Sequence, residues 1–212
     1  MPPMYGPPPH RKSSAGLLIG LLAGGVVLVV VIAVVVFAVY MVNTDHKLST
    51  PPSAGGMSRD TVTEARAVKQ VETQRGIIQR ASEFKISDFV SAVYASGELK
   101  YLFVGGTGKF DAKKLRVQFD SSVNTEVQGK LIASTTEVFD KGRDGKAVCT
   151  SLMTRPGTTP FAGSTLCAWA TRTSFATITP LAATTSLTGT RPEYSFTGVA
   201  AQMRKIRGDV ED

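Results

Sequence analysis

The sequence predicts an α+β protein: one transmembrane helix followed by a small extracytoplasmic domain with an antiparallel sheet and packed helices. Three patterns lead to this fold class. Every residue from Ala15 to Val42 is apolar or Gly, the apolar spacing after residue 60 is helical, and from Ile86 onward it alternates with a period of two. The 212 residues divide into four segments: a disordered Pro-rich cytoplasmic head (1–14), a transmembrane helix (15–42), a flexible linker (43–59) and the extracytoplasmic domain (60–212).

The apolar run has 28 residues, and about 18 such residues already indicate a helix that spans a bilayer. Arg11 and Lys12 precede the run. Because positive charge stays on the cytoplasmic side, we expect a cytoplasmic N-terminus and a C-terminal domain outside the cell. A cleaved signal peptide has an apolar core of only about 7 to 15 residues. The run is therefore expected to remain in the plasma membrane as a single-pass signal anchor, with the lipid bilayer as its partner.

Within the run, Gly16, Gly20 and Gly24 recur every four residues and would line one side of the helix. Small residues at this spacing form the packing faces of associating membrane helices. Gly and Ala are also common in membrane helices that do not associate. A homo-oligomer formed through this face is therefore a hypothesis.

The first elements after the run are a tether and a helix. Pro51, Pro52 and the Gly pair at 55–56 are typical of a flexible linker. Asp60 or Thr61 can cap a helix over about residues 60 to 74, and the helix extends at most to Glu83. Its apolar stripe consists of Val62, Ala65, Val68 and Val71.

Strand patterns dominate the rest of the chain. A hairpin is expected from residues 88–95 and 99–104, joined by Ser96-Gly97-Glu98. Asp111 then caps a short helical stretch in which Ala112, Leu115 and Phe119 share a face. Four more strands are expected, over about 127–139, 147–153, 165–170 and 174–179.

A C-terminal helix is expected over about residues 196–207, and Ser195 or Thr197 can cap its N-terminus. Its apolar residues recur at helical spacing, so one face should pack on the sheet. These residues are Val199, Met203, Ile206 and Val210.

Cys149 and Cys167 are the only cysteines, and we expect them to form a disulfide. In a hairpin that pairs these two residues, the loop is centred on Thr158, within a Pro- and Gly-containing turn. Closing a loop of about 18 residues contributes on the order of 3 kcal/mol. Trp169 faces the same side as Cys167 and can pack against the bridge. A redox pair is the alternative, but the spacing is not C-x-x-C and no charge cluster would activate a thiolate.

The histidine content excludes several kinds of catalytic site. The chain has two His, His10 and His46, and both flank the apolar run. The outer domain therefore lacks the His that triads and the usual zinc sites need, and we expect neither a metal nor a cofactor. The segment from Gly105 to Lys109 resembles a phosphate-binding loop only in part, because Phe103 and Phe110 occupy positions that need Gly and Ser or Thr. We interpret it as a glycine loop.

The carboxylates leave one enzymatic alternative open. Asp88, Glu98, Asp111 and Glu137 are present, and two of them could meet as the catalytic pair of an exported hydrolase. Nothing in their spacing pairs them. We therefore expect solvated surface carboxylates and a protein that is not an enzyme.

The formal net charge is +7, and the part after the apolar run has 22 Lys or Arg against 17 Asp or Glu. Cations cluster over residues 109–116 and 204–207. Such clusters attract anionic lipid or cell-wall polymer, although a solvated face is the simpler interpretation. The expected compartment disfavours nucleic-acid binding, so we expect no nucleic-acid partner.

The stretches Val148-Cys149-Thr150 and Leu166-Cys167-Ala168-Trp169-Ala170 precede a strand and an Arg-rich C-terminal helix. In these features the chain resembles uncharacterised actinobacterial single-pass membrane proteins, which have a Pro-rich N-terminus and an extracytoplasmic Cys…Cys-x-Trp-Ala domain. In that group an acidic residue often follows the motif, where this chain has Thr171 and Arg172. The resemblance implies an envelope protein. Together with the composition, it predicts a non-catalytic binding or assembly module whose partner is an envelope protein or an anionic polymer.

Overall fold

The chain forms two compact units, residues 1–43 and 44–212. A computed structural model describes residues 29–39, 45–127, 131–138, 140, 143–154, 164–181 and 194–212. In the first unit, residues 29–39 are helical and their side chains are exposed. Among the described residues, no helix is both long and apolar enough to cross a membrane. Most of the expected 15–42 span lies outside the described residues, as do Arg11, Lys12, Gly16, Gly20 and Gly24.

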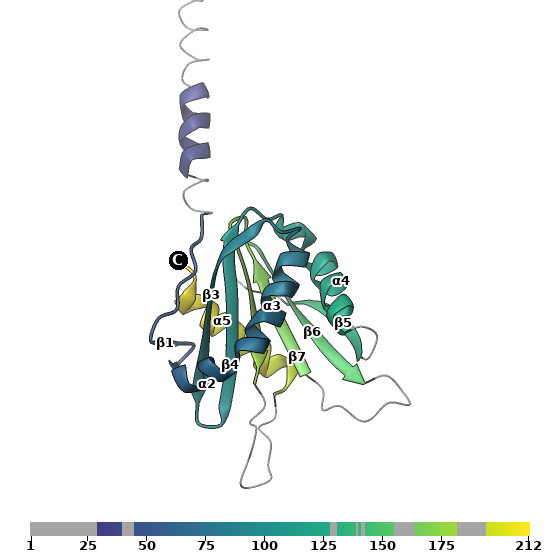
Figure 1. The fold of residues 1–212 in the computed structure, drawn as a ribbon. Helices are drawn as coiled ribbons and strands as arrows, with labels where there is room; N and C mark the ends of the chain where they lie inside the picture. Colours follow the sequence, from purple (N-terminus) through teal and green to yellow (C-terminus); the bar gives the residue numbers. More distant parts are fainter. Residues whose placement is uncertain are drawn as a thin grey trace, which may run out of the picture. The chain divides into compact units, whose positions relative to one another are not determined.

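The described part of the second unit is α+β, as the sequence predicts. Eight antiparallel strands form one sheet in the order β1-β2-β3-β4-β8-β7-β6-β5 (Figure 1). The strands are β1 (Ser53–Ala54), β2 (Met57–Arg59), β3 (Ile86–Ser96), β4 (Leu99–Gly108), β5 (Leu131–Val138), β6 (Lys146–Thr154), β7 (Ser164–Ala170) and β8 (Ser174–Pro180). The helices are α2 (Thr61–Arg66), α3 (Val68–Ala81), the 3-10 turn η1 (Ala112–Lys114), α4 (Leu115–Val127) and α5 (Phe196–Val210).

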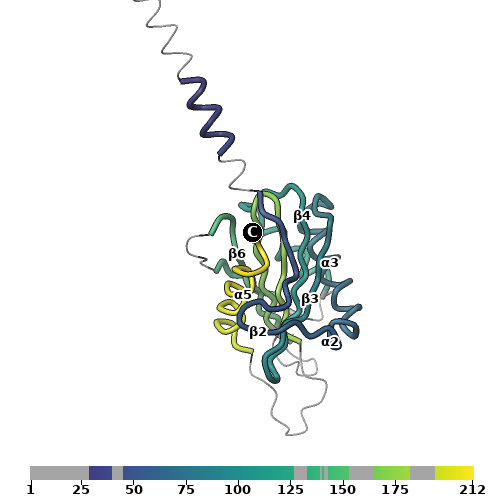
Figure 2. Tube along the Cα trace, turned by 90° about the vertical axis from the view of Figure 1, so that its left-hand side faces the viewer, coloured from purple at the N-terminus to yellow at the C-terminus, as the bar shows by residue number. Residues whose placement is uncertain are grey.

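Helices cover both faces of the sheet, with α3 and α4 on one side and α5 on the other (Figures 1 and 2). The alternation along β7 explains how one strand serves both layers. Cys167 and Trp169 belong to the core under α5, whereas Ala168 and Ala170 belong to the core under α3 and α4. Strand side chains alternate between faces, so both layers are packed by the same strands.

The expected hairpin, short helical stretch and C-terminal helix are confirmed. Gly97 lies in the β3–β4 turn with φ +59°, a left-handed conformation that glycine adopts readily. Asp111 accepts a hydrogen bond from the backbone of Lys113, and Ser195 accepts one from the backbone of Gly198. The predicted α5 stripe is buried along its whole length; it consists of Val199, Met203, Ile206 and Val210.

The expected disulfide is also confirmed. Cys149 on β6 and Cys167 on β7 are direct partners in the antiparallel register, with Cα atoms 4.0 Å apart, and their sulfur atoms are bonded. Trp169 is buried in the same cluster as the bridge, as its position two residues from Cys167 predicts. Thr158, the expected centre of the loop, lies outside the described residues.

The prediction of a flexible linker over 43–59 is wrong for its described part. Ala54 pairs with Met57 in the β1–β2 hairpin, and both side chains are buried. Gly55 and Gly56 have φ values of +62° and +74°, the backbone of a two-residue turn with positive φ at both positions. The Gly pair that is typical of a tether therefore builds a tight hairpin at the edge of the sheet.

The helix expected over residues 60 to 74 is two helices, α2 and α3, which meet at Ala67. Most of the predicted stripe is not the packed face, because Val62, Ala65 and Val68 are exposed and only Val71 packs against the core. Instead, Ile77, Ile78 and neighbouring small residues of α3 are buried against the sheet. The segment therefore packs on the domain and is not a free stalk.

Candidate functional site

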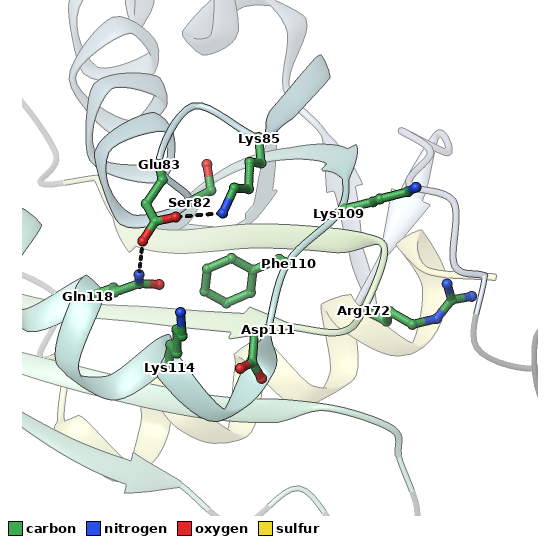
Figure 3. Close-up of a pocket in the computed structure, with 9 residues that line it drawn as sticks. All are labelled: Ser82, Glu83, Lys85, Lys109, Phe110, Asp111, Lys114, Gln118 and Arg172. Atoms are coloured by element: carbon green, nitrogen blue, oxygen red, sulfur yellow. Dashed lines mark hydrogen bonds and ion pairs between the residues drawn. The ribbon is translucent and has the colours of Figure 1, made fainter.

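A hollow of about 510 Å³ opens at one end of the sheet, where β3 begins and β4 ends. Residues from four segments line the hollow: the loop after α3, the segment after β4, helix α4 and the β7–β8 turn. Figure 3 shows the ring of Phe110 at its centre with charged side chains around it. The lining residues are Ser82, Glu83, Lys85, Lys109, Phe110, Asp111, Lys114, Gln118 and Arg172.

Backbone hydrogen bonds fix the floor of this hollow. Gly108 N donates to Thr173 O (3.0 Å) and Phe110 N donates to Arg172 O (2.9 Å), which fastens the end of β4 to the β7–β8 turn. The Phe110 ring is only 8% exposed, and its centroid lies 5.0 Å from that of Phe175 in the core. The floor is therefore an aromatic surface held rigidly by the sheet.

Four cations line the hollow against two carboxylates. Two of the cations are paired: Lys85 Nζ lies 2.5 Å from Glu83 Oε2, and Arg172 forms an ion pair with Asp45. The side chains of Lys109 and Lys114 have no hydrogen bond or ion pair with any residue that the structure describes. In Figure 3, Lys114 points toward the Phe110 ring, whereas Lys109 extends away from it. The hollow therefore presents two ammonium groups that form no ion pair with a described residue, and it has an aromatic floor.

Glu83 is held in its ionised form. The hydrogen bond from Lys85 is the main cause that lowers the pKa of this carboxyl, and the positive charges of Lys85 and Lys114 add to it. Gln118 Nε2 donates to the other oxygen at 3.0 Å, which links α4 to the loop after α3. The oxygen of the Gln118 amide has no partner among the described residues. The Glu83 carboxylate is therefore fixed in the wall of the hollow by Lys85 and Gln118.

The structure corrects the glycine-loop interpretation of Gly105 to Lys109. Gly105 and Gly106 lie inside strand β4, and a side chain on Gly106 would collide with the backbone of Ser87. Strand β3 has a bulge at this point, between Ser87 and Val90. The glycines therefore allow two strands to approach closely, and the strand delivers Lys109 to the hollow.

The predicted cationic cluster at 204–207 is divided between surface and core. Lys205 is exposed, but the Arg207 side chain is 1% exposed. Its guanidinium donates to Asp140 Oδ2 (2.7 Å), Glu211 Oε2 (2.5 Å) and the backbone oxygen of Asp144 (2.6 Å). Arg207 therefore holds the domain together and is not available to a ligand.

The carboxylates considered for a hydrolase are not brought together. Asp88 lies in β3, Glu98 in the hairpin turn, Asp111 before η1 and Glu137 in β5, and no hydrogen bond or ion pair links any two of these side chains among the described residues. No group of three or more metal-ligating side chains occurs in the described part of the chain either. The arrangement at the hollow suits the binding of an anionic group.

Sequence reasoning found the basic stretch that contains Lys109 and Lys114 but missed the partners that make it a site. Lys85, Gln118 and Arg172 come from three further segments, and no spacing rule connects them. Only the fold places them around one ring.

No family model matches the chain, and neither does any curated protein or solved structure. The chemistry of the hollow therefore rests on this chain's own residues.

Proposed function

We propose that the protein is a single-pass, membrane-anchored component of the cell envelope whose extracytoplasmic domain is a non-catalytic binding module. The 28-residue apolar run and the preceding Arg11 and Lys12 support the anchor and its direction. The disulfide between Cys149 and Cys167 supports an oxidising compartment for the domain. The likeness to uncharacterised actinobacterial envelope proteins and self-association through Gly16, Gly20 and Gly24 belong to the same proposal.

The observation that carries the binding role is that two ammonium groups of the hollow, those of Lys109 and Lys114, form no hydrogen bond or ion pair with any described residue. Each exposed ammonium group is solvated on its own, but two of them at one hollow raise the local positive potential. They favour an anionic group carried by a ligand or partner. The two carboxylates of the hollow are already engaged, Glu83 by Lys85 and Asp111 by the backbone of Lys113. The geometry therefore favours binding over hydrolysis by a carboxylate pair.

Titration of the full-length protein in a neutral detergent with a short inorganic polyphosphate tests this role. We expect binding that weakens with added salt and that is lost in the double variant K109Q/K114Q. The matched control is R66Q/K69Q, which removes the same charge from exposed positions on α2 and α3. Equal binding by both double variants would mean that general positive charge, and not the hollow, attracts the probe.

A further inference from the structure

We propose that the end of the domain that carries the hollow docks on the anionic surface of the anchoring bilayer, with Lys109 and Lys114 at the lipid phosphates and Phe84 in the interface. This inference rests on the proposed function and names the binding partner of the same site. Three independent features of the described residues support it: the position of the chain's entry into the domain, one exposed aromatic side chain, and the distribution of charge.

The chain's entry places the hollow near the bilayer. Asp45 lies only three positions after Val42, the last residue of the apolar run. Asp45 is already part of the domain, because it forms an ion pair with Arg172 at the rim of the hollow, and His46 N donates to Thr173 Oγ1 at 2.7 Å. Three extended residues reach about 10 Å. With the apolar run in the membrane, Asp45 is therefore within that reach of the lipid headgroups, and Arg172 is one ion pair further.

Phe84 projects from the same end of the domain. Its side chain is 73% exposed, and it lies between Glu83 and Lys85, which both line the hollow. Glu83 and Phe84 have φ values of +54° and +61°, a left-handed conformation that L residues seldom adopt. The backbone NH of Phe84 donates to Gln79 O at 2.7 Å, so the loop is fixed with its ring outward. Aromatic side chains favour the boundary between headgroups and acyl chains, which gives this exposed ring a partner.

The charges at this end match an anionic lipid surface. Lys85, Lys109, Lys114 and Arg172 line the hollow, and two of these four cations, Lys109 and Lys114, form no hydrogen bond or ion pair with a described residue. A lysine beside an anionic membrane strengthens attachment by about five-fold, and the attraction decays within a Debye length. The short connection between the apolar run and the domain keeps these lysines within about one Debye length of the membrane surface, where the attraction acts.

The test uses the full-length chain in liposomes and a single new tryptophan as the reporter. Phe84→Trp keeps an aromatic ring at the docking position, while Trp169, the one native tryptophan, is buried in the core and serves as an internal reference. Lipids with brominated acyl chains quench tryptophan that enters the interface. The liposomes consist of phosphatidylcholine alone or of phosphatidylcholine mixed with phosphatidylglycerol.

We expect emission from position 84 to be quenched in the mixed liposomes and not in phosphatidylcholine. In the K109Q/K114Q background the docked-to-free ratio should fall by about five-fold for each lysine removed, and R66Q/K69Q should leave it unchanged. Val62→Trp provides a second control, because Val62 is also exposed (63%) and lies on α2, beyond the opposite end of α3 (Figure 1).

Three results would overturn the docking proposal: no quenching at position 84 in either lipid, equal quenching in both lipids, or equal quenching at positions 62 and 84. None of these results would contradict polyphosphate binding at the hollow or the proposed membrane topology. Conversely, a domain that faces the cytoplasm would refute the proposed function even if position 84 is quenched. Quenching in liposomes does not depend on which side of the cell membrane the domain occupies. The two proposals can therefore fail separately.

Discussion

At the scale of single residues, buried charge holds the domain's C-terminal helix in place. Glu211 binds Arg207 and also accepts hydrogen bonds from the Trp169 indole (3.1 Å) and the Ser174 hydroxyl (2.5 Å). One carboxylate thus joins α5 to β7 and β8. A sequence pattern assigns Arg207 to a solvated basic cluster, because its burial depends on an acidic residue, Asp140, that is far away in the chain.

Replacing Arg207 by Met tests this network. We expect the free energy of unfolding to fall by about 3–5 kcal/mol, because Glu211 and Asp140 would be left as buried charges without their partner. Lys205→Met removes the same charge from the exposed face of the same helix and should change stability by less than about 0.5 kcal/mol. Urea denaturation of both variants gives the comparison. Equal stability of the two would show that the Arg207 ion pairs contribute nothing net.

The cap of α2 makes stability depend on pH. Asp60 accepts hydrogen bonds from Lys100 Nζ (2.7 Å) and from the backbone and hydroxyl of Thr63, and the Lys100 bond is the main cause that holds its pKa well below the usual range. A carboxyl whose pKa is lower in the folded state stabilises the protein above the pKa of the unfolded chain, about 4. This contribution is lost as the pH falls further.

Asp60→Asn should therefore lower the free energy of unfolding by about 1.5 kcal/mol at pH 7, since the charged hydrogen bonds are weakened. The difference between the free energies of unfolding of D60N and the unmodified protein should narrow below pH 4, where the carboxyl of Asp60 takes up a proton in the unfolded chain but not yet in the folded one. Urea midpoints at pH 7 and pH 3 check this. A difference of the same size at both pH values would contradict the assignment.

At the scale of elements, the first and last segments of the domain are hydrogen-bonded to each other. Leu48 pairs with Glu211 in an antiparallel bridge, Ser49 N donates to Val210 O (2.8 Å), and Asp212 N donates to Lys47 O (3.2 Å). Figure 2 shows this entry segment beside the C-terminus.

The strands, the hairpin and the disulfide could be predicted because periodicity and loop symmetry are local signals. The β1–β2 hairpin could not, because Pro and Gly residues are equally typical of a tether.

The disulfide joins two strands in the middle of the β8-β7-β6-β5 half of the sheet, so its effect on stability belongs to this scale. Reduction should lower the free energy of unfolding by about 3 kcal/mol, because an open loop of 18 residues gains freedom in the unfolded chain. Urea midpoints with and without reductant measure this. The variant C149A/C167A should show no response to reductant, and an unchanged midpoint after verified reduction of the bridge would contradict the prediction.

At the scale of the whole molecule, the α+β class of the second unit was predictable from the sequence but the site was not. Alternating apolar residues determine which strands exist and which faces they bury, and these signals extend over a few residues each. The hollow combines Lys85, Lys109, Lys114 and Arg172 from separate segments, so it exists only after the sheet has formed. Phe84 is a further example, because its exposure follows from the backbone conformation of the loop after α3 and not from its residue type.

The central claim is that the domain lies outside a membrane that the apolar run crosses once, and thiol labelling in intact cells tests it most directly. The two native cysteines are joined in the disulfide, so a new cysteine at exposed Lys69 or at Ser13 in the head is the only free thiol. We predict that a membrane-impermeant maleimide labels K69C in intact cells and labels S13C only after permeabilisation. Labelling of S13C in intact cells with protection of K69C would contradict the account.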